Sequence, residues 1–357
     1  MYRLYVNSMS PYALKSSAMI GYAGLPCEPV IQNVVNRFAT LKRLTGKTMI
    51  PVLRRGEWAI NDSSRIAEYL VGHGERPLLA RDEALAPICW LLEDFADEWL
   101  SMWVLLSRWS HEADVEQNTE EIGRELTGGL PVLSGVIGQL AVVGIRKNVR
   151  RGGARPANEQ ALNRSRERFL QALETVLDAG PDFLFERYPT VADFAIFGQL
   201  HQYGRDPTGG DELRLYPSVR EYLQRLDAMA LPHPAVHLHA ADSRPVSDLA
   251  PLLAEFLGTY GRVLVANHRA YHGSERPDGL EVAMLDGEVF SLRPNGYLAA
   301  RLEFVLGQLD RAYTEREELF GGKGLELEHA LVQLVGRLTD YPAGRELMRK
   351  FPSIAKD

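Results

Sequence analysis

Residues 50–70 read IPVLRRGEWAINDSSRIAEYL, and this stretch decides the fold. Its first part predicts a β-hairpin, because two strand-like runs, Ile50–Leu53 and Glu57–Ile60, are joined by a short turn through Arg54–Gly56. A helix is predicted to follow, because the apolar residues after Asp62 recur at helical spacing. Asp62 is a favoured N-cap residue for that helix. The stretch therefore predicts two antiparallel strands followed by a helix.

Upstream of the hairpin, the sequence predicts a strand, a helix and a second strand. The strand Tyr2–Val6 precedes a helix over residues 12–24, and Pro11 suits the first turn of that helix. The second strand falls within Glu28–Val35, and this order implies a parallel pair with a right-handed crossover. With a short helix before the hairpin, the order is βαβαββα, and the predicted α/β domain spans residues 1–77.

Beyond the first domain, the hydrophobic pattern becomes helical. An all-α domain is predicted over residues 82–231, in which residues 130–149 are expected to be mixed helix and loop between two Gly-Gly pairs. After Pro232 a linker-like segment leads to an extension over residues 240–357. This extension is predicted to be mostly helical, with a β-hairpin that turns at Asp286–Gly287.

Composition excludes several classes of protein. The chain has 357 residues, 45% of them hydrophobic and 24% charged, as is typical of a globular protein of two or three domains. Its formal net charge of −7 argues against a nucleic acid or a membrane surface as the main partner. Cys27 and Cys89 are its 2 cysteines, which excludes a disulfide framework or a cysteine-rich zinc site. We see no secretory signal at the start and expect a cytoplasmic location.

Four motifs, in their order and spacing, resemble the cytosolic glutathione transferases. They are Ser10-Pro11-Tyr12-Ala13, Met49-Ile50-Pro51-Val52-Leu53, the segment NDSSRIAEYL at 61–70, and Pro189-Thr190-Val191-Ala192-Asp193-Phe194. The resemblance covers roughly residues 1–230. It implies a thioredoxin-like first domain that binds glutathione as co-substrate, an all-α second domain of the transferase type, and a homodimer. The extension is a part that ordinary two-domain members lack.

The resemblance assigns roles to residues of the first domain. Pro51 is expected to be cis, so that the backbone N–H and C=O of Ile50 pair with the cysteinyl unit of glutathione. Asp62 and Ser63, at a helix N-terminus, are expected to bind the charged γ-glutamyl end. Ser10 is expected to donate to the bound sulfur and stabilise its thiolate, which makes glutathione the nucleophile.

Structural alternatives accompany these assignments. Ser10 is also a good cap for the first helix, and Ser8 is close enough to compete for the catalytic role. Asp62 and Ser63 form an ordinary N-cap pair as well, although capping and ligand binding use the same geometry here.

The glycyl carboxylate of glutathione has three candidate partners. Met49 stands where several serine-type classes of the family have lysine. The resemblance therefore leaves Asn36, Arg37 and Lys47 to contact this carboxylate.

A pocket for the second substrate is expected above Ser10. The resemblance indicates Tyr12 and Trp103 as lining residues. Trp103 lies on a helical stripe with Trp99 and Trp109, however, and such a stripe is more often part of the core.

Two further sets of residues allow a functional interpretation. One is a basic run in the second domain, which is either a solvated segment or an attractor of an anionic electrophile: Arg146, Lys147, Arg150, Arg151 and Arg155. The other is His268 with His272, whose spacing is one that metal sites use. No carboxylate or cysteine near them in the sequence completes a set, so no metal is expected.

The resulting hypothesis is a glutathione transferase-like enzyme, of the kind used in detoxification, that activates the glutathione thiolate for attack on a small, largely apolar electrophile. Serine at position 10 favours conjugation over reduction, because serine forms no mixed disulfide. Two alternatives remain open. One is a non-catalytic binding or scaffold protein with the same fold, and the other is a glutathione-dependent isomerase or lyase.

Overall fold

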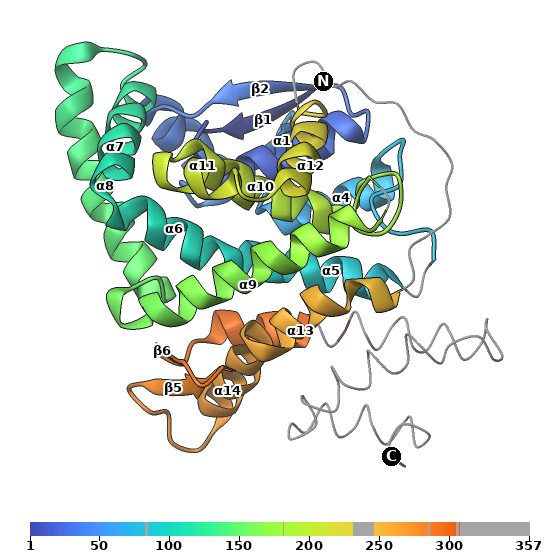
Figure 1. Cartoon of the computed structure of the whole chain (residues 1–357). Coiled ribbons are helices and arrows are strands. Elements are labelled where there is room, and N and C mark those ends of the chain that lie inside the picture. The colour runs from blue at the N-terminus through green and yellow to red at the C-terminus, as the bar shows by residue number, and fades with distance from the viewer. Residues whose placement is uncertain (83–84, 181, 231–245, 285, 305–306, 308–357) are drawn as a thin grey trace.

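The structure, a computed structural model, describes residues 1–82, 85–180, 182–230, 246–284, 286–304 and 307. It begins with an α/β domain, drawn in blue in Figure 1. The elements of this domain are β1 (Tyr2–Val6), α1 (Pro11–Tyr22), β2 (Cys27–Ile31), α2 (Val34–Asn36), the π-helical turn η1 (Arg37–Leu41), α3 (Lys42–Thr45), β3 (Val52–Arg55), β4 (Trp58–Asn61) and α4 (Ser63–His73). The predicted order βαβαββα is confirmed, with η1 joining α2 to α3 as its short second helix.

A single mixed sheet organises the domain, with strand order β2-β1-β3-β4. β1 and β2 are parallel, with Tyr2 opposite Cys27, as a right-handed crossover through α1 requires. β1 is antiparallel to β3, and β3 is antiparallel to β4. The tight turn between β3 and β4 places Gly56 at a φ of 62°, which glycine adopts without strain. This sheet gives the domain its thioredoxin-like fold.

The α1 helix joins the two domains of the transferase-like region. It packs against α4 on one side and against α10 (Val191–Arg205) of the helical domain on the other. Gly198 makes the second contact close, because a Cβ atom there would lie 2.5 Å from the backbone oxygen of Pro11. The start of α1 is therefore held directly against α10.

Long helices make up the second domain (Figure 1). They are α5 (Ala86–Phe95), continued by the π-helical turn η3 (Ala96–Leu100) into α6 (Ser101–Ser110), then α7 (Glu112–Leu126), α8 (Pro131–Gly152), the short η4 (Pro156–Asn158), α9 (Glu159–Asp178), α10, α11 (Pro207–Leu213) and α12 (Pro217–Asp227). α10 packs against α5 and η3, so it lies between the α/β domain and the helical core.

Residues 130–149 are not the mixed helix and loop expected from their glycines. Leu130 is the N-cap of α8, and the residues after it belong to this continuous helix of 22 residues, which packs along α7. One glycine from each helix allows this packing: a Cβ at Gly138 of α8 would lie 2.4 Å from the Thr119 backbone oxygen, and one at Gly123 of α7 would lie 2.1 Å from that of Ser134. Glycine here indicates close contact between helices and not a turn.

The described part of the extension adds further elements. They are the short η5 (Val246–Leu249), α13 (Ala250–Gly258), α14 (Tyr260–His272), β5 (Leu280–Ala283), β6 (Val289–Leu292) and a helix over residues 296–304. β5 and β6 form the predicted antiparallel hairpin, but its connection spans residues 284–288 and is longer than a two-residue turn. Residues 308–357 lie outside the described part of the chain.

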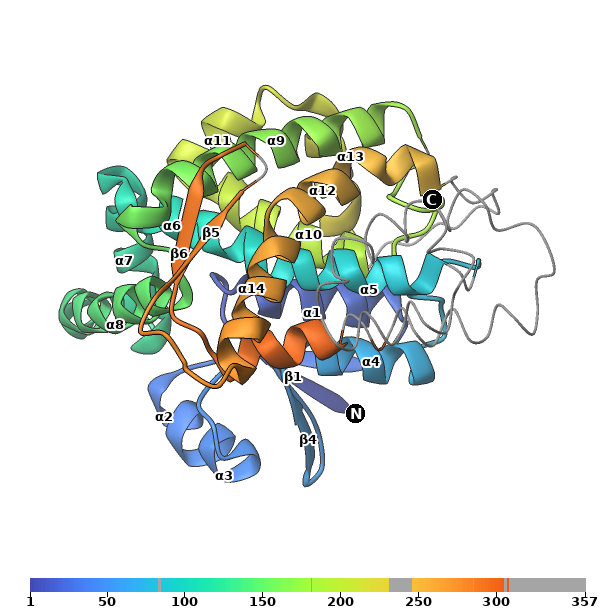
Figure 2. The same cartoon turned by 90° about the horizontal axis from the view of Figure 1, so that it is seen from below.

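The extension shares the core of the helical domain. Figure 1 shows α13 and α14, in orange, against the helical domain, and α13 packs on α9. Phe256 and Tyr260 are buried against Phe95 of α5, with ring centroids 5.6 and 6.2 Å from that of Phe95. In the underside view of Figure 2, helix 296–304 runs beside α5. Within the described ranges, no helix combines the length and apolarity needed to cross a membrane.

Candidate functional site

Ser10 caps the N-terminus of α1. Its Oγ accepts a hydrogen bond from the backbone N–H of Ala13 at 3.2 Å, and its side chain is partly exposed. Among the described residues, its hydroxyl hydrogen has no acceptor. Ser8 differs, because its hydroxyl donates to Oε1 of Glu121 at 2.7 Å. The geometry therefore favours Ser10 over Ser8 as a donor to a ligand.

Side chains of the helical domain fix the segment that leads to Ser10. Nε2 of Gln202, on α10, donates to the Ser8 carbonyl at 2.8 Å. Nη1 of Arg108, on α6, donates to the Met9 carbonyl at 3.1 Å. The approach to α1 is thus held by two helices of the second domain, and the position of Ser10 depends on both domains.

Asp62 caps α4 in the predicted manner. Its Oδ1 accepts from the backbone N–H groups of Ser64 and Arg65 at 3.0 and 3.4 Å, and its φ of 102° is unusual for a residue other than glycine. The residue is exposed, and its Oδ2 has no partner in the described part of the chain. Ser63 is buried, and its hydroxyl donates to Oδ2 of Asp97 at 3.1 Å. Only the backbone of Ser63 is then available to a ligand.

The peptide bond between Ile50 and Pro51 is cis, as predicted. Ile50 precedes β3, and neither its N–H nor its C=O has a hydrogen-bond partner among the described residues. The Pro51 carbonyl accepts from Nδ2 of Asn61 at 3.0 Å and from the N–H of Asp62 at 3.4 Å. The structure therefore brings Ile50, Pro51 and Asp62 together at one end of β3 and β4.

The three candidates for the glycyl carboxylate differ in their surroundings. Asn36 is engaged in a capping box with Asn33. Arg37, on η1, is partly buried and Lys47 is exposed, and neither forms an ion pair with a described carboxylate. These two cations lie in the segment between β2 and β3.

Tyr12 lies one residue into α1 and points at the second domain. Its hydroxyl donates to the backbone oxygen of Asp97 at 3.0 Å. Burial raises the pKa of this hydroxyl well above its ordinary value, and the nearby carboxylates of Glu98 and Asp97 raise it further. Tyr12 is therefore a neutral donor and is not a source of a phenolate base.

Two family models match the sequence, one over the α/β domain and one within the helical domain. Residues 4–77 match the glutathione S-transferase N-terminal domain, and residues 159–225 match the glutathione S-transferase C-terminal domain. Both domains of the glutathione S-transferase family are therefore recognised in this chain. No curated protein sequence matches it.

Two solved structures with similar folds share 20% identity or less with this chain. A GST-like protein from Pseudomonas syringae has 20% identity and a TM-score of 0.48, with 65% of this chain and 68% of that chain covered. Beta-etherase LigF from Sphingobium sp. strain SYK-6 has 18% identity and a TM-score of 0.45, with 64% and 95% covered.

One predicted pocket residue, Trp103, lies in the hydrophobic core. Its side chain is fully buried. Its ring lies 5.3 Å from that of Tyr203 and 6.4 Å from that of Phe169, between α10 and α9. The core alternative is correct for Trp103, because the stripe faces neighbouring helices along its length. Tyr12 remains a predicted pocket residue.

Sequence reasoning missed a cluster of three buried acids and one half-buried acid beside Ser63. Its members lie on α5 and η3 and are Glu93, Asp94, Asp97 and Glu98. Lys15 of α1 pairs with Glu93 and Asp97, and Arg301 of helix 296–304 pairs with Asp94. The sequence did carry one signal of this cluster: two adjacent acidic pairs, Glu93-Asp94 and Asp97-Glu98, lie four residues apart in an otherwise apolar helical stretch.

Burial has the largest effect on the pKa values of three acids in this cluster. It raises the pKa of Asp94 and that of Asp97 to about 6, although Arg301 and Lys15 respectively oppose the shift. Burial, with the charge of Asp94, raises the pKa of Glu98 to about 8, and the Tyr297 hydroxyl that contacts Glu98 opposes this. The extension thus supplies two of the groups that stabilise the acids next to α4.

Proposed function

We propose that this protein binds glutathione in its α/β domain and that Ser10 stabilises the glutathione thiolate for attack on a small, largely apolar electrophile. The free hydroxyl hydrogen of Ser10 carries the proposal. Its Oγ accepts from Ala13, so within the described residues the O–H remains available to donate to a sulfur. The N-terminus of α1, a helix of 12 residues, adds a favourable field for an anion.

In the proposed step, the thiol of glutathione loses its proton to solvent, and the sulfur lone pair forms a bond to an electrophilic carbon. A leaving group departs with the bonding electrons. Each unit by which Ser10 and the helix lower the thiol pKa corresponds to about 1.4 kcal/mol in favour of the thiolate. Because the thiolate is the nucleophile, lowering its pKa raises the reactive fraction at neutral pH.

Other groups of the same domain suit the rest of the ligand. The free backbone groups of Ile50 match an extended peptide backbone, and the N-terminus of α4 matches the γ-glutamyl carboxylate. The unpartnered Oδ2 of Asp62 suits the ammonium group. Arg37 and Lys47 supply cations for the glycyl carboxylate.

Calorimetric titration with reduced glutathione tests the proposal, with Asp62→Asn as the matched variant. Asparagine keeps an oxygen to cap α4 but removes the charge that would pair with the ammonium group. We expect saturable binding by the wild type and binding weakened at least about tenfold in the variant. Absence of binding by the wild type, or equal binding by both proteins, contradicts the proposed site.

Turnover distinguishes the two alternative functions. We expect a sulfur-containing conjugate from model electrophiles. Binding without turnover would support a scaffold role, and a sulfur-free product with regenerated glutathione would support an isomerase or lyase. We also expect a homodimer and a cytoplasmic location, as the family resemblance implies, and the mass in solution tests the first of these.

A further inference from the structure

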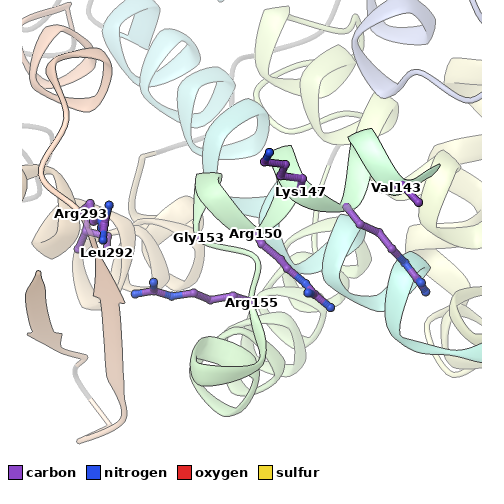
Figure 3. Close-up of a pocket in the computed structure, with 8 residues that line it drawn as sticks. Val143, Lys147, Arg150, Gly153, Arg155, Leu292 and Arg293 are labelled. Atoms are coloured by element: carbon purple, nitrogen blue, oxygen red, sulfur yellow. The ribbon is translucent and has the colours of Figure 1, made fainter. Parts of the chain in front are cut away.

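A basic pocket of about 920 Å3 opens between the end of α8 and the end of β6 (Figure 3). Five cationic side chains line it, and Val143 and Leu292 add apolar wall. The cations are Arg146, Lys147, Arg150, Arg155 and Arg293. Four of them come from the basic run noted in the sequence, whereas Arg293 comes from the extension. The side chain of Arg151 lies outside the described part.

No carboxylate balances this charge within the described chain. Neither an aspartate nor a glutamate lines the pocket, and none of the five cations forms an ion pair with a described acid. The whole chain carries a formal net charge of −7, so a cluster of five cations is not explained by an overall excess of basic residues. Like charges placed together without acids are unfavourable unless a counter-ion occupies the space between them.

Two of the arginines are held in place by hydrogen bonds. Nη2 of Arg155 donates to the backbone oxygen of Ser291 at 2.6 Å and to its hydroxyl at 2.9 Å. Nη2 of Arg146 donates to the Trp109 carbonyl at 2.8 Å. In both arginines, the buried Nε–H has no partner among the described residues. Buried donors are normally satisfied, so these two N–H groups are available to a further acceptor.

The backbone at Gly153 brings the two walls together. Its φ of 116° suits glycine, and a Cβ there would lie 2.9 Å from the Phe290 ring of β6. Figure 3 shows Arg155 reaching from this segment toward β6, on whose side Arg293 and Leu292 lie. Both the helical domain and the extension are therefore needed to complete the pocket.

We infer that this pocket binds a small molecule with two or more anionic groups, phosphate or carboxylate. Guanidinium groups bind both oxyanions in bidentate fashion, and cations on two walls suit separated charges. The apolar residues suit a short carbon skeleton between them. The inference goes beyond the proposed glutathione site, because it uses none of the residues of that site.

Calorimetric titration of the full chain with pyrophosphate and, separately, with citrate tests the inference at matched ionic strength. We expect saturable binding of at least one of them, and the preferred probe distinguishes phosphate from carboxylate ligands. The variant Arg150→Gln/Arg293→Gln, at two exposed positions, should bind at least about tenfold more weakly. Arg214→Gln, at an exposed arginine paired with Asp211, is the matched control and should bind as the wild type does.

Three results would overturn the inference. They are absence of binding of both anions, equal binding in the double variant, and binding of a single-stranded oligonucleotide in preference to both small anions. Repeating the titration on Asp62→Asn separates the two sites. We expect anion binding to be unchanged in that variant, even if glutathione binding proves absent from the wild type.

A second and independent observation concerns His268 and His272 on α14. The structure brings Glu303 of helix 296–304 to them, which the sequence spacing did not reveal. Its Oε1 lies 3.3 Å from Nε2 of His268 and 3.8 Å from Nε2 of His272, and the three ligand atoms all lie within 4.8 Å of one another. Ligands about 2.0–2.1 Å from a tetrahedral zinc ion lie about 3.3–3.4 Å apart, so small movements of these side chains would bring the three atoms to that geometry.

We propose that His268, His272 and Glu303 bind a divalent ion of the zinc type, with a fourth position open to solvent at the exposed side of Glu303. The ion would join α14 to helix 296–304. We titrate the metal-free full chain with zinc. His272→Ala is expected to bind one equivalent fewer than the wild type, and Glu303→Gln is expected to bind zinc at least about tenfold more weakly. His111→Ala, at an exposed histidine elsewhere, should retain that equivalent. Unchanged stoichiometry and affinity in both ligand variants would overturn the proposal.

Discussion

Nζ of Lys15 lies 2.7 Å from Oδ2 of Asp97, and the Ser63 hydroxyl donates to the same oxygen at 3.1 Å. The side chains of Lys15 and Asp97 are 1% and 4% exposed, so this contact is shielded from water. It joins α1, α4 and η3 at one point. The helix that carries Ser10 and the helix that Asp62 caps are thus fixed relative to each other by a buried charge.

Lys15→Met should destabilise the protein strongly. The substitution keeps most of the volume but leaves Glu93 and Asp97 buried without their cation, which costs about 3–5 kcal/mol of unfolding free energy. Urea denaturation measures this change. Arg214→Met removes an exposed pair with Asp211 and should cost about 1 kcal/mol or less. Similar losses of unfolding free energy in the two variants would show that the buried ion pairs stabilise the protein no more than an exposed pair does.

Stability should depend on pH through Glu98. Because burial raises the pKa of this carboxyl in the folded protein from 4.5 to about 8, its protonation favours the folded state. That contribution is complete below the unfolded pKa and is lost as the pH rises through about 8. The unfolding free energy should therefore fall between about pH 6 and about pH 8, and should fall less in Glu98→Gln. Urea titrations across this range measure both slopes, and equal slopes would contradict the assignment.

Arg37→Gln and Lys47→Gln should weaken glutathione binding through the glycyl carboxylate. Loss of a charge-assisted hydrogen bond predicts a loss of about tenfold in affinity for whichever cation contacts it. Calorimetry with the glycyl monoethyl ester of glutathione supplies the control. The wild type and the responsive variant should bind the ester equally well, because the ester lacks the carboxylate. If a variant binds the ester as weakly as it binds glutathione, the cation that it lacks does not contact the glycyl carboxylate.

Gly198→Ala should disturb the start of α1. Its Cβ would lie 2.5 Å from the Pro11 backbone oxygen, and such overpacking costs about 1–3 kcal/mol. Gly135→Ala is the matched control, since that helical glycine faces open space and alanine should stabilise by up to about 1 kcal/mol. Thermal unfolding compares the two. Opposite signs are expected, and a neutral Gly198→Ala would contradict the close contact between α1 and α10.

The sequence predicted the α/β domain well because its signals are local. Hairpin spacing, the cap at Asp62 and the proline at position 51 each depend on a few neighbouring residues. The α8 helix was not predicted in full, because glycine in a sequence favours turns, whereas Gly138 is explained only by its contact with the backbone of α7.

The charged interior of the site was beyond sequence reasoning for a similar reason. Lys15 and Arg301 reach their acids from segments distant in the chain, with separations of 82 and 207 residues for Asp97 and Asp94. The aromatic stripe that includes Trp103 gives the same periodicity whether it faces a core or a cavity. Spacing identifies a face, and only the packing of other elements shows what that face contacts.

The most direct test of the central claim is the pKa of the glutathione thiol in the binary complex, measured by the ultraviolet absorbance of its thiolate. We predict a pKa below that of free glutathione in the wild type and in Ser8→Ala, and a rise of about one unit or more in Ser10→Ala. A thiol pKa equal to that of free glutathione in the wild-type complex, or one unchanged by Ser10→Ala, would contradict the claim.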